Sequence, residues 1–152
     1  MLLMDKVFLK ILFLIPIIGY ANDPFEEINR EVWTFNEGVD NRIARPVAEF
    51  YDDVVPTPVQ SSITNFFSNL DEIDNSINQL LQGKPVAAGN DFARFLVNTT
   101  FGFLGFFDVA SIMGLEEHDE DFGQTLGVWG VPTGPYLMLP FYGPSSPRDL
   151  VG

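Results

Sequence analysis

The sequence predicts a mainly helical domain that ends in an irregular segment. Apolar residues recur every three or four positions along the chain between residues 25 and 81, which is the period of amphipathic helices. By contrast, residues 125–149 contain nine glycines and prolines in 25 positions, a composition that breaks helices although the stretch also carries large apolar side chains. The chain has 152 residues and is 46% hydrophobic, so we expect one domain.

The N-terminus is typical of a secretory signal peptide. Lys6 and Lys10 precede an apolar run from residue 11 to residue 18, and Gly19-Tyr20-Ala21 follows as a cleavage pattern. This predicts a signal peptide over residues 1–21 and an exported domain over residues 22–152. An N-terminal anchor helix is the alternative, less favoured because the run is far shorter than the roughly 20 residues that span a bilayer.

Composition excludes several kinds of site. The chain has no cysteine, so it has no disulfide, no thiolate metal site and no lipidation site beside the predicted cleavage point. The predicted mature chain keeps six basic and twenty acidic residues, a net charge near −14. Such a charge repels nucleic acid and anionic lipid, so any affinity for membranes must come from apolar area.

Two helices are predicted before residue 56. Asp23 is a candidate cap with Pro24 in the first helical position, and the first apolar stripe follows from there. Gly38 and the pair Arg45-Pro46 weaken or end this helix, and a second short helix is expected before Pro56 and Pro58 break the chain. The apolar residues of the two helices are Phe25, Ile28, Val32, Phe35 and Val39, then Val47, Phe50, Tyr51 and Val54.

From Thr57 the pattern predicts helix up to Gly83, a good C-terminal stop. Asp71 and Glu72 indicate a bend, so two helices joined at a corner are expected. Asparagines recur along the stretch, and ordinary polar-face or capping roles are favoured for them over lining a wet passage. They are Asn65, Asn69, Asn75 and Asn78.

A further helix is predicted from Asn90, and it loses its polar face along the way. Between Phe101 and Leu115 the only charge is Asp108. A helix that is apolar all round is either buried in a core or in contact with lipid. Composition alone favours the buried core helix, while a single transmembrane span is disfavoured because only about fifteen residues are uninterrupted against the ~20 required.

No catalytic, cofactor or metal residue is predicted. The lone histidine, His118, lies among carboxylates, where a solvated acidic loop is favoured over a metal site. No phosphate-cradling glycine loop or nucleophile elbow is present. A hydrolase would have to use the carboxylates around His118, which requires burial to separate their pKa values. These are Glu116, Glu117, Asp119 and Asp121.

Several motifs resemble the MlaA family, also called VacJ, of outer-membrane phospholipid-transport proteins. They read "DPFEEINREVWTFN", "RPVAEFY", "NFFSNL", "LLQGKP", "RFLVNTTFGFLGFFDVA" and "DFGQTLGVWGVPTGPYLMLPFYGPSSPRD". The last two are the most specific, because their order of glycines, prolines, Asn-Thr and Arg-Asp is very improbable by chance. The resemblance covers nearly all of the predicted mature chain.

The resemblance implies amphipathic helices that form part of a ring-shaped domain within the outer membrane, on its periplasmic face, around a polar channel. It implies that mislocalised phospholipids are taken from the outer leaflet to maintain lipid asymmetry and passed to a soluble periplasmic carrier of the Mla system. That carrier delivers them to an inner-membrane ATPase complex, and trimeric porins are further partners. No enzyme activity and no cofactor is implied.

Two departures from the family pattern are visible. The family carries a lipobox cysteine after its signal, whereas this region reads "IIGYAND". The family also continues with further helices beyond Arg148-Asp149, so the chain resembles a truncated member.

On this resemblance, the apolar turn region is expected to contact lipid tails, and polar or aromatic residues to mark the channel or its rim. The alternative is a soluble periplasmic interaction or binding protein whose apolar helix is core. The lipid-facing candidates are Phe101, Phe103, Leu104, Phe106 and Phe107; the channel or rim candidates are Asp108, Trp129, Tyr136 and Tyr142.

Overall fold

The computed structural model describes residues 23–152, so the predicted signal peptide lies outside the described residues. The described chain is mainly helical, as predicted. Its elements are α2 (Glu26–Val39), the π-helix η1 (Asp40–Ala44), α3 (Arg45–Val54), α4 (Thr57–Leu81), α5 (Pro85–Phe101), α6 (Val109–Ile112), α7 (Phe122–Val128), β1 (Leu137–Leu139), β2 (Gly143–Ser145) and the 3-10 helix η2 (Asp149–Val151).

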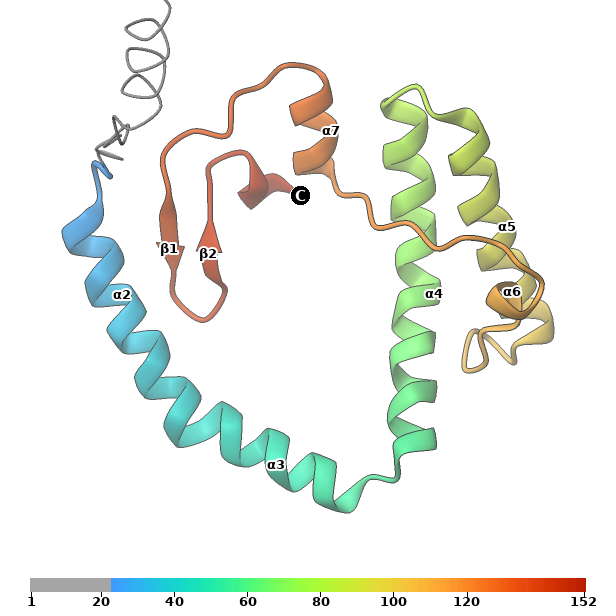
Figure 1. Ribbon diagram of the computed structural model, residues 1–152, viewed down its shortest axis with the longest axis horizontal. Coiled ribbons are helices and arrows are strands. Elements are labelled where there is room, and N and C mark those ends of the chain that lie inside the picture. The colour runs from blue at the N-terminus through green and yellow to red at the C-terminus, as the bar shows by residue number, and fades with distance from the viewer. Residues whose placement is uncertain (1–22) are drawn as a thin grey trace, which may run out of the picture.

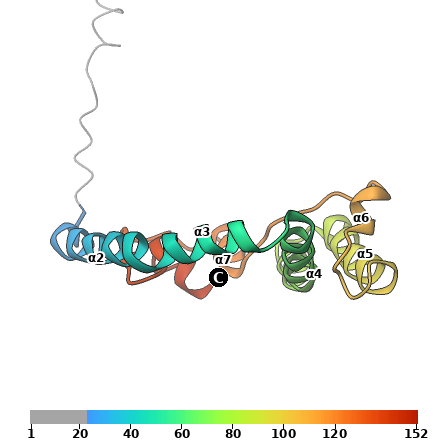
Figure 2. The same ribbon diagram turned by 90° about the horizontal axis from the view of Figure 1, so that it is seen from below.

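The elements follow one another around a curve. Helices α2 and α3 form an arc, α4 continues it on the far side, and the strands β1 and β2 return beside α2 (Figure 1). Viewed from below, the helices lie close to one plane and the molecule is a thin layer (Figure 2). No helix among residues 23–152 is long and apolar enough to cross a membrane.

The first two helices are more continuous than expected. The π-helix η1 joins α2 directly to α3, so neither Gly38 nor Arg45-Pro46 ends the helix. Arg45 forms a salt bridge of 3.0 Å with Asp40 across this π-helical turn. The predicted break at Pro56 is confirmed, because α3 ends at Val54 and α4 begins at Thr57.

Helix α4 is one helix of 25 residues, so the predicted corner at Asp71 and Glu72 is wrong. No glycine or proline interrupts it between residues 59 and 81. Glu72 is buried inside the fold, where its carboxylate pairs with Arg94 of α5. An acidic residue in mid-helix therefore reflects a tertiary contact. The predicted stop is confirmed, with Gly83 in the left-handed region at φ 77°.

The prediction that one long apolar helix continues past Phe101 is also wrong. Helix α5 begins at Pro85 and ends at Phe101, and the apolar residues after it form a tight turn. Phe103, Leu104 and Gly105 all have positive φ, at 52°, 61° and 95°, which a helix cannot contain. A Cβ atom on Gly102 would lie 2.0 Å from the backbone oxygen of Phe107, so this close approach requires glycine.

The glycine- and proline-rich segment is more regular than predicted. Its first four residues belong to α7, and its middle forms an antiparallel hairpin in which Leu137 pairs with Ser145 and Leu139 with Gly143. The hairpin lies along α2, and the residues between α7 and β1 form an extended connection (Figure 1).

Burial is inverted relative to a water-soluble protein. Among residues 23–152, the only buried apolar side chains are Ala88 and Ala110, whereas twelve polar or charged residues are buried. Large apolar side chains are exposed, with Phe101 at 74% and Phe103 at 71%. The composition-based preference for a buried apolar core helix is therefore wrong. The buried polar residues are Asn29, Asn69, Glu72, Asn75, Ser76, Asn78, Gln79, Asp91, Arg94, Asn98, Thr125 and Ser146.

Candidate functional site

The centre of the polar interior is Arg94, which α5 places between α4 and the turn that leads to α6. Its Nε donates to the carboxylate of Glu72, and both side chains are only 2% exposed. Its Nη1 donates to Ser111 Oγ at 3.1 Å and to the backbone oxygen of Leu115 at 2.7 Å. A single guanidinium therefore joins three segments, and its charge is compensated inside the fold.

Asp108 connects the apolar turn to this centre. It accepts hydrogen bonds from Asn98 Nδ2 at 3.0 Å and from the Ser111 backbone at 3.1 Å, and it lies 3.4 Å from Arg94 Nη2. Burial acts to raise the pKa of Asp108, but the hydrogen bonds from Ser111 and Asn98 and the charge of Arg94 outweigh it, so the pKa is lowered. Asp108 is 27% exposed and caps α6. It remains a prediction that this residue marks the edge of a channel.

A strap of residues 115–121 crosses the α4–α5 pair and is held by polar contacts. Asn75 of α4 donates to the backbone oxygen of His118 at 2.7 Å and accepts from the Glu120 backbone at 3.0 Å. His118 Nδ1 lies 2.7 Å from Asp91 Oδ1, and Asp91 is fully buried. His118 is therefore a partly buried anchor, and the predicted solvated loop is wrong for this residue.

The end of the strap is fixed to the α4–α5 turn. Lys84 Nζ forms a salt bridge of 2.7 Å with Glu120, and Gln82 Nε2 donates to the same carboxylate at 2.7 Å. Burial acts to raise the pKa of Glu120, and the hydrogen bonds from Lys84 and Gln82 reverse the effect and lower it.

The remaining carboxylates of the strap do not form an arrangement for acid and base chemistry. All four that a hydrolase would use are exposed, and Asp121 caps α7 through a bond of 2.5 Å from the Gln124 backbone. Within the described residues, no group of three or more histidine, aspartate or glutamate side chains is placed to hold a metal ion.

Two asparagines of α2 hold the C-terminal hairpin. Asn29 donates to the Tyr136 backbone oxygen at 3.1 Å and accepts from the Met138 backbone at 2.8 Å. Asn36 lies two helical turns later. It donates to the Leu139 backbone oxygen and accepts from the Phe141 backbone, each at 2.8 Å. The two side-chain amides bond backbone groups in and beside β1 that would otherwise lack hydrogen-bond partners at the sheet edge. The sequence interpretation missed both residues, although their spacing of seven places them on one side of a helix.

The lipid-facing candidates lie together on the turn after α5. Phe101, Phe103, Leu104 and Phe107 are 74%, 71%, 58% and 59% exposed. Phe106 is half-buried and stacks on Phe66 of α4, with ring centroids 5.1 Å apart. Four of the five predicted residues therefore present apolar surface outward, and the fifth fastens the turn to α4.

The three aromatic rim candidates are separated along the C-terminal part of the chain. Trp129 is half exposed, and its Nε1 donates to the backbone oxygen of Leu81 at 3.0 Å, which fastens the end of α7 to α4. Tyr136 precedes β1, and Tyr142 lies in the hairpin turn and is 89% exposed. These residues do not converge on a single site.

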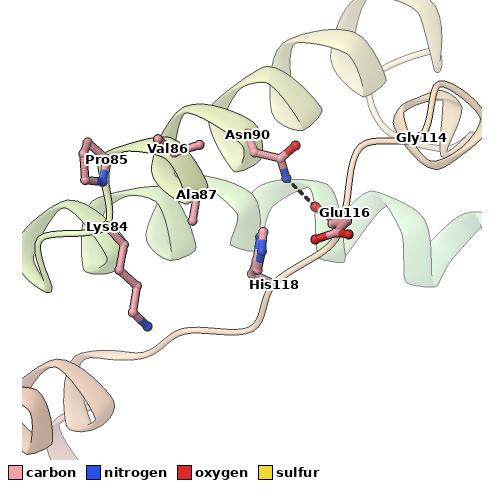
Figure 3. A pocket seen from close by; sticks show the side chains of 8 residues that line it. All are labelled: Lys84, Pro85, Val86, Ala87, Asn90, Gly114, Glu116 and His118. Carbon is pink, nitrogen blue, oxygen red and sulfur yellow. Dashed lines mark hydrogen bonds between the residues drawn. The ribbon is translucent and has the colours of Figure 1, made fainter.

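A pocket of about 570 Å³ opens between the start of α5 and the strap. Pro85, Val86 and Ala87 form its apolar wall, and His118 points from the strap toward α5 (Figure 3). Asn90 donates to the backbone oxygen of Glu116 at the other side of the pocket (Figure 3).

Comparison with known proteins identifies the chain's relatives. The family described as MlaA lipoprotein matches residues 21–152. The intermembrane phospholipid transport system lipoprotein MlaA of Haemophilus influenzae is 41% identical over 138 residues, which are 89% of this chain and 55% of the relative. The protein of the same description from Escherichia coli K12 is 43% identical over 134 residues, covering 84% of this chain and 53% of the relative.

A solved structure agrees with these relatives. It is reported as "Structural basis for maintenance of bacterial outer membrane lipid asymmetry", is 42% identical, and superposes with a TM-score of 0.78 over 84% of this chain and 66% of that chain. The chain spans about half the length of the curated relatives it matches. The chain belongs to the MlaA lipoprotein family.

Proposed function

We propose that the chain is an outer-membrane component of a retrograde phospholipid transport system. In this role it takes mislocalised phospholipids from the outer leaflet and passes them toward the periplasm, which maintains lipid asymmetry. The observation that supports this most directly is the inverted burial: the described part of the chain has twelve buried polar residues inside a surface of exposed phenylalanine, leucine and isoleucine. Such a surface is costly in water and favourable against acyl chains.

The membrane geometry follows from the flat shape. Because the helices lie close to one plane, the molecule fits within a leaflet with its helices along the membrane (Figure 2). The arc of α2, α3 and α4 is consistent with part of a ring (Figure 1). Phe101, Phe103, Leu104 and Phe107 contact lipid tails in this arrangement, and Phe106 supports them from behind.

Transport requires no covalent chemistry in this proposal. Moving two acyl chains of about sixteen carbons each into water costs on the order of 25 kcal/mol, at about 0.8 kcal/mol per methylene. The protein lowers this barrier by giving the headgroup a polar path while the tails stay against apolar surface. Asp108, Trp129, Tyr136 and Tyr142 lie at the channel or its rim. The free energy for net movement comes from the partners downstream.

The partners and the route of export complete the proposal. Residues 1–21 direct export and are removed, and residues 22–152 act at the periplasmic face of the outer membrane. There the protein associates with trimeric porins and delivers phospholipid to a soluble periplasmic carrier. The exposed apolar surface of the described residues holds it against the acyl chains.

Membrane association tests the lipid-contact residues. The double substitution Phe103→Ser and Phe107→Ser removes two exposed rings, and we expect the protein to move from the membrane fraction into the soluble fraction. Thr100→Ser, at an exposed position just before the turn, is the control and leaves the distribution unchanged. A native protein that purifies as a monomer without detergent would favour the soluble periplasmic alternative.

Transport itself is tested in cells. In a strain that lacks its own family member, phospholipid in the outer leaflet is measured by its accessibility to added phospholipase. Expression of the chain is expected to lower this accessibility. An unchanged accessibility, with the chain present in the outer membrane, contradicts the transport proposal.

A further inference from the structure

The interface between α4 and α5 contains buried polar atoms with no hydrogen-bond partner among the described residues. Gln79 is fully buried, and neither its amide nitrogen nor its amide oxygen is bonded. One carboxylate oxygen of Glu72 and one of Asp91 are in the same situation, as are the amide oxygens of Asn69 and Gln82. Native proteins leave few such atoms unbonded, so a group of six requires a physical explanation.

Five of these six atoms belong to residues of α4 and its C-terminal cap. Asn69, Glu72, Gln79 and Gln82 are spaced three, seven and three residues apart, which places them on one side of α4. Asp91 lies on α5, which packs there: Ser76 Oγ donates to the backbone oxygen of Ala88 at 3.0 Å. We name these five residues, Asn69, Glu72, Gln79, Gln82 and Asp91, the polar seam.

The pocket beside α5 adjoins the polar seam at two points. The Lys84 backbone donates to the Gln79 backbone oxygen at 2.8 Å, and Lys84 lines the pocket. His118 also lines the pocket (Figure 3), and its Nδ1 lies 2.7 Å from Oδ1 of Asp91. Two residues that line the pocket are therefore bonded directly to residues of the polar seam.

We propose that the polar seam binds ordered waters that exchange with solvent through this pocket. A water molecule donates two hydrogen bonds and accepts two, so it satisfies both atoms of the Gln79 amide and the acceptor oxygens of Glu72 and Asp91. The proposal concerns the interior of the α4–α5 pair and holds whether or not the chain transports lipid.

Two substitutions on neighbouring residues of α4 test the proposal. Gln79→Met keeps the shape of the side chain and removes its amide. If the amide binds water, the thermal unfolding midpoint in detergent falls by about 2–4 °C, the effect of one lost hydrogen bond in a chain of this size. If the amide has no hydrogen-bond partner, its burial costs free energy, and the substitution removes this cost. The midpoint then rises, which overturns the proposal.

Asn78→Leu is the matched control. Asn78 is buried on the same helix, but both ends of its amide are bonded, to Thr125 Oγ1 at 2.9 Å and to the Asp74 backbone oxygen at 3.0 Å. Its substitution lowers the midpoint in either case and shows that the assay detects a lost amide.

The unmodified protein provides a readout independent of folding defects. A crystal structure at a resolution that reveals ordered solvent is expected to show waters within hydrogen-bond distance of Gln79 and Asp91. Clear density for both side chains with no water beside either of them overturns the proposal.

Discussion

Removal of the Arg94 side chain is expected to destabilise the fold more than any exposed charge substitution. Arg94→Met leaves Glu72 buried without its cation, and breaking one partner of a buried pair costs about 3–5 kcal/mol. The bonds to Ser111 and to the Leu115 backbone are lost as well. At about 2–4 °C per kcal/mol, the midpoint of thermal unfolding falls by roughly 10 °C.

Arg30→Met is the control for this prediction. Arg30 also pairs with a glutamate, Glu26 at 2.8 Å, but its side chain is 79% exposed, and such helical pairs contribute about 0.3–0.5 kcal/mol. Both variants are measured by thermal unfolding in the same detergent. The double variant Glu72→Met with Arg94→Met recovers much of the loss, because no buried charge is left unpaired. If Arg94→Met is as mild as Arg30→Met, the polar interior does not stabilise the fold as inferred.

Three further outcomes are expected. Gly102→Ala places a methyl group against the Phe107 backbone oxygen and sharply lowers the yield of folded protein. The control Gly89→Ala is tolerated, because open space surrounds that position. Equal yields of the two variants contradict the turn geometry. Asn36→Leu removes two bonds to the hairpin and makes the hairpin the preferred site of limited proteolysis, and an unchanged digestion pattern contradicts the clamp. The pKa of Asp108 is lower in the folded state than its usual value of 3.8, so its ionised carboxylate stabilises the fold at neutral pH, and this stabilisation is lost as the pH falls below 3.8. Asp108→Asn is therefore expected to reduce the loss of stability at acid pH, measured as the unfolding midpoint against pH. The same loss in both proteins contradicts this prediction.

Much of the helical layout was predictable because it depends on local chemistry. Pro56 and Gly83 bound α4 as expected, since proline and a left-handed glycine act on the backbone at their own positions. The apparent bend at Glu72 was wrong because a charged residue in mid-helix marks a tertiary partner as readily as it marks a helix end. The turn after Phe101 was missed because its positive φ values occur at Phe103 and Leu104, residues that rarely adopt them.

The candidate site was predictable only in its apolar half. The phenylalanines near residue 103 stand out in the sequence by composition, and the structure exposes most of them. The polar half depends on pairs that are far apart in the chain, such as Asn29 with Met138 and Asn75 with Glu120. Asparagine is common on helix surfaces and at caps, so its presence alone does not distinguish a solvated side chain from a buried clamp.

The sequence by itself determined that the chain is helical, strongly acidic and apolar along regular stripes, and its motifs identified the family. Only the tertiary structure decided which way the stripes face. A helical stripe has the same period whether it packs into a core or lies against lipid, because the period follows from the helix and not from its surroundings. The direction is set by contacts such as those of Arg94 with Glu72 and of Asn69 with Thr99, which turn the polar faces of α4 and α5 toward each other and leave the apolar faces outside.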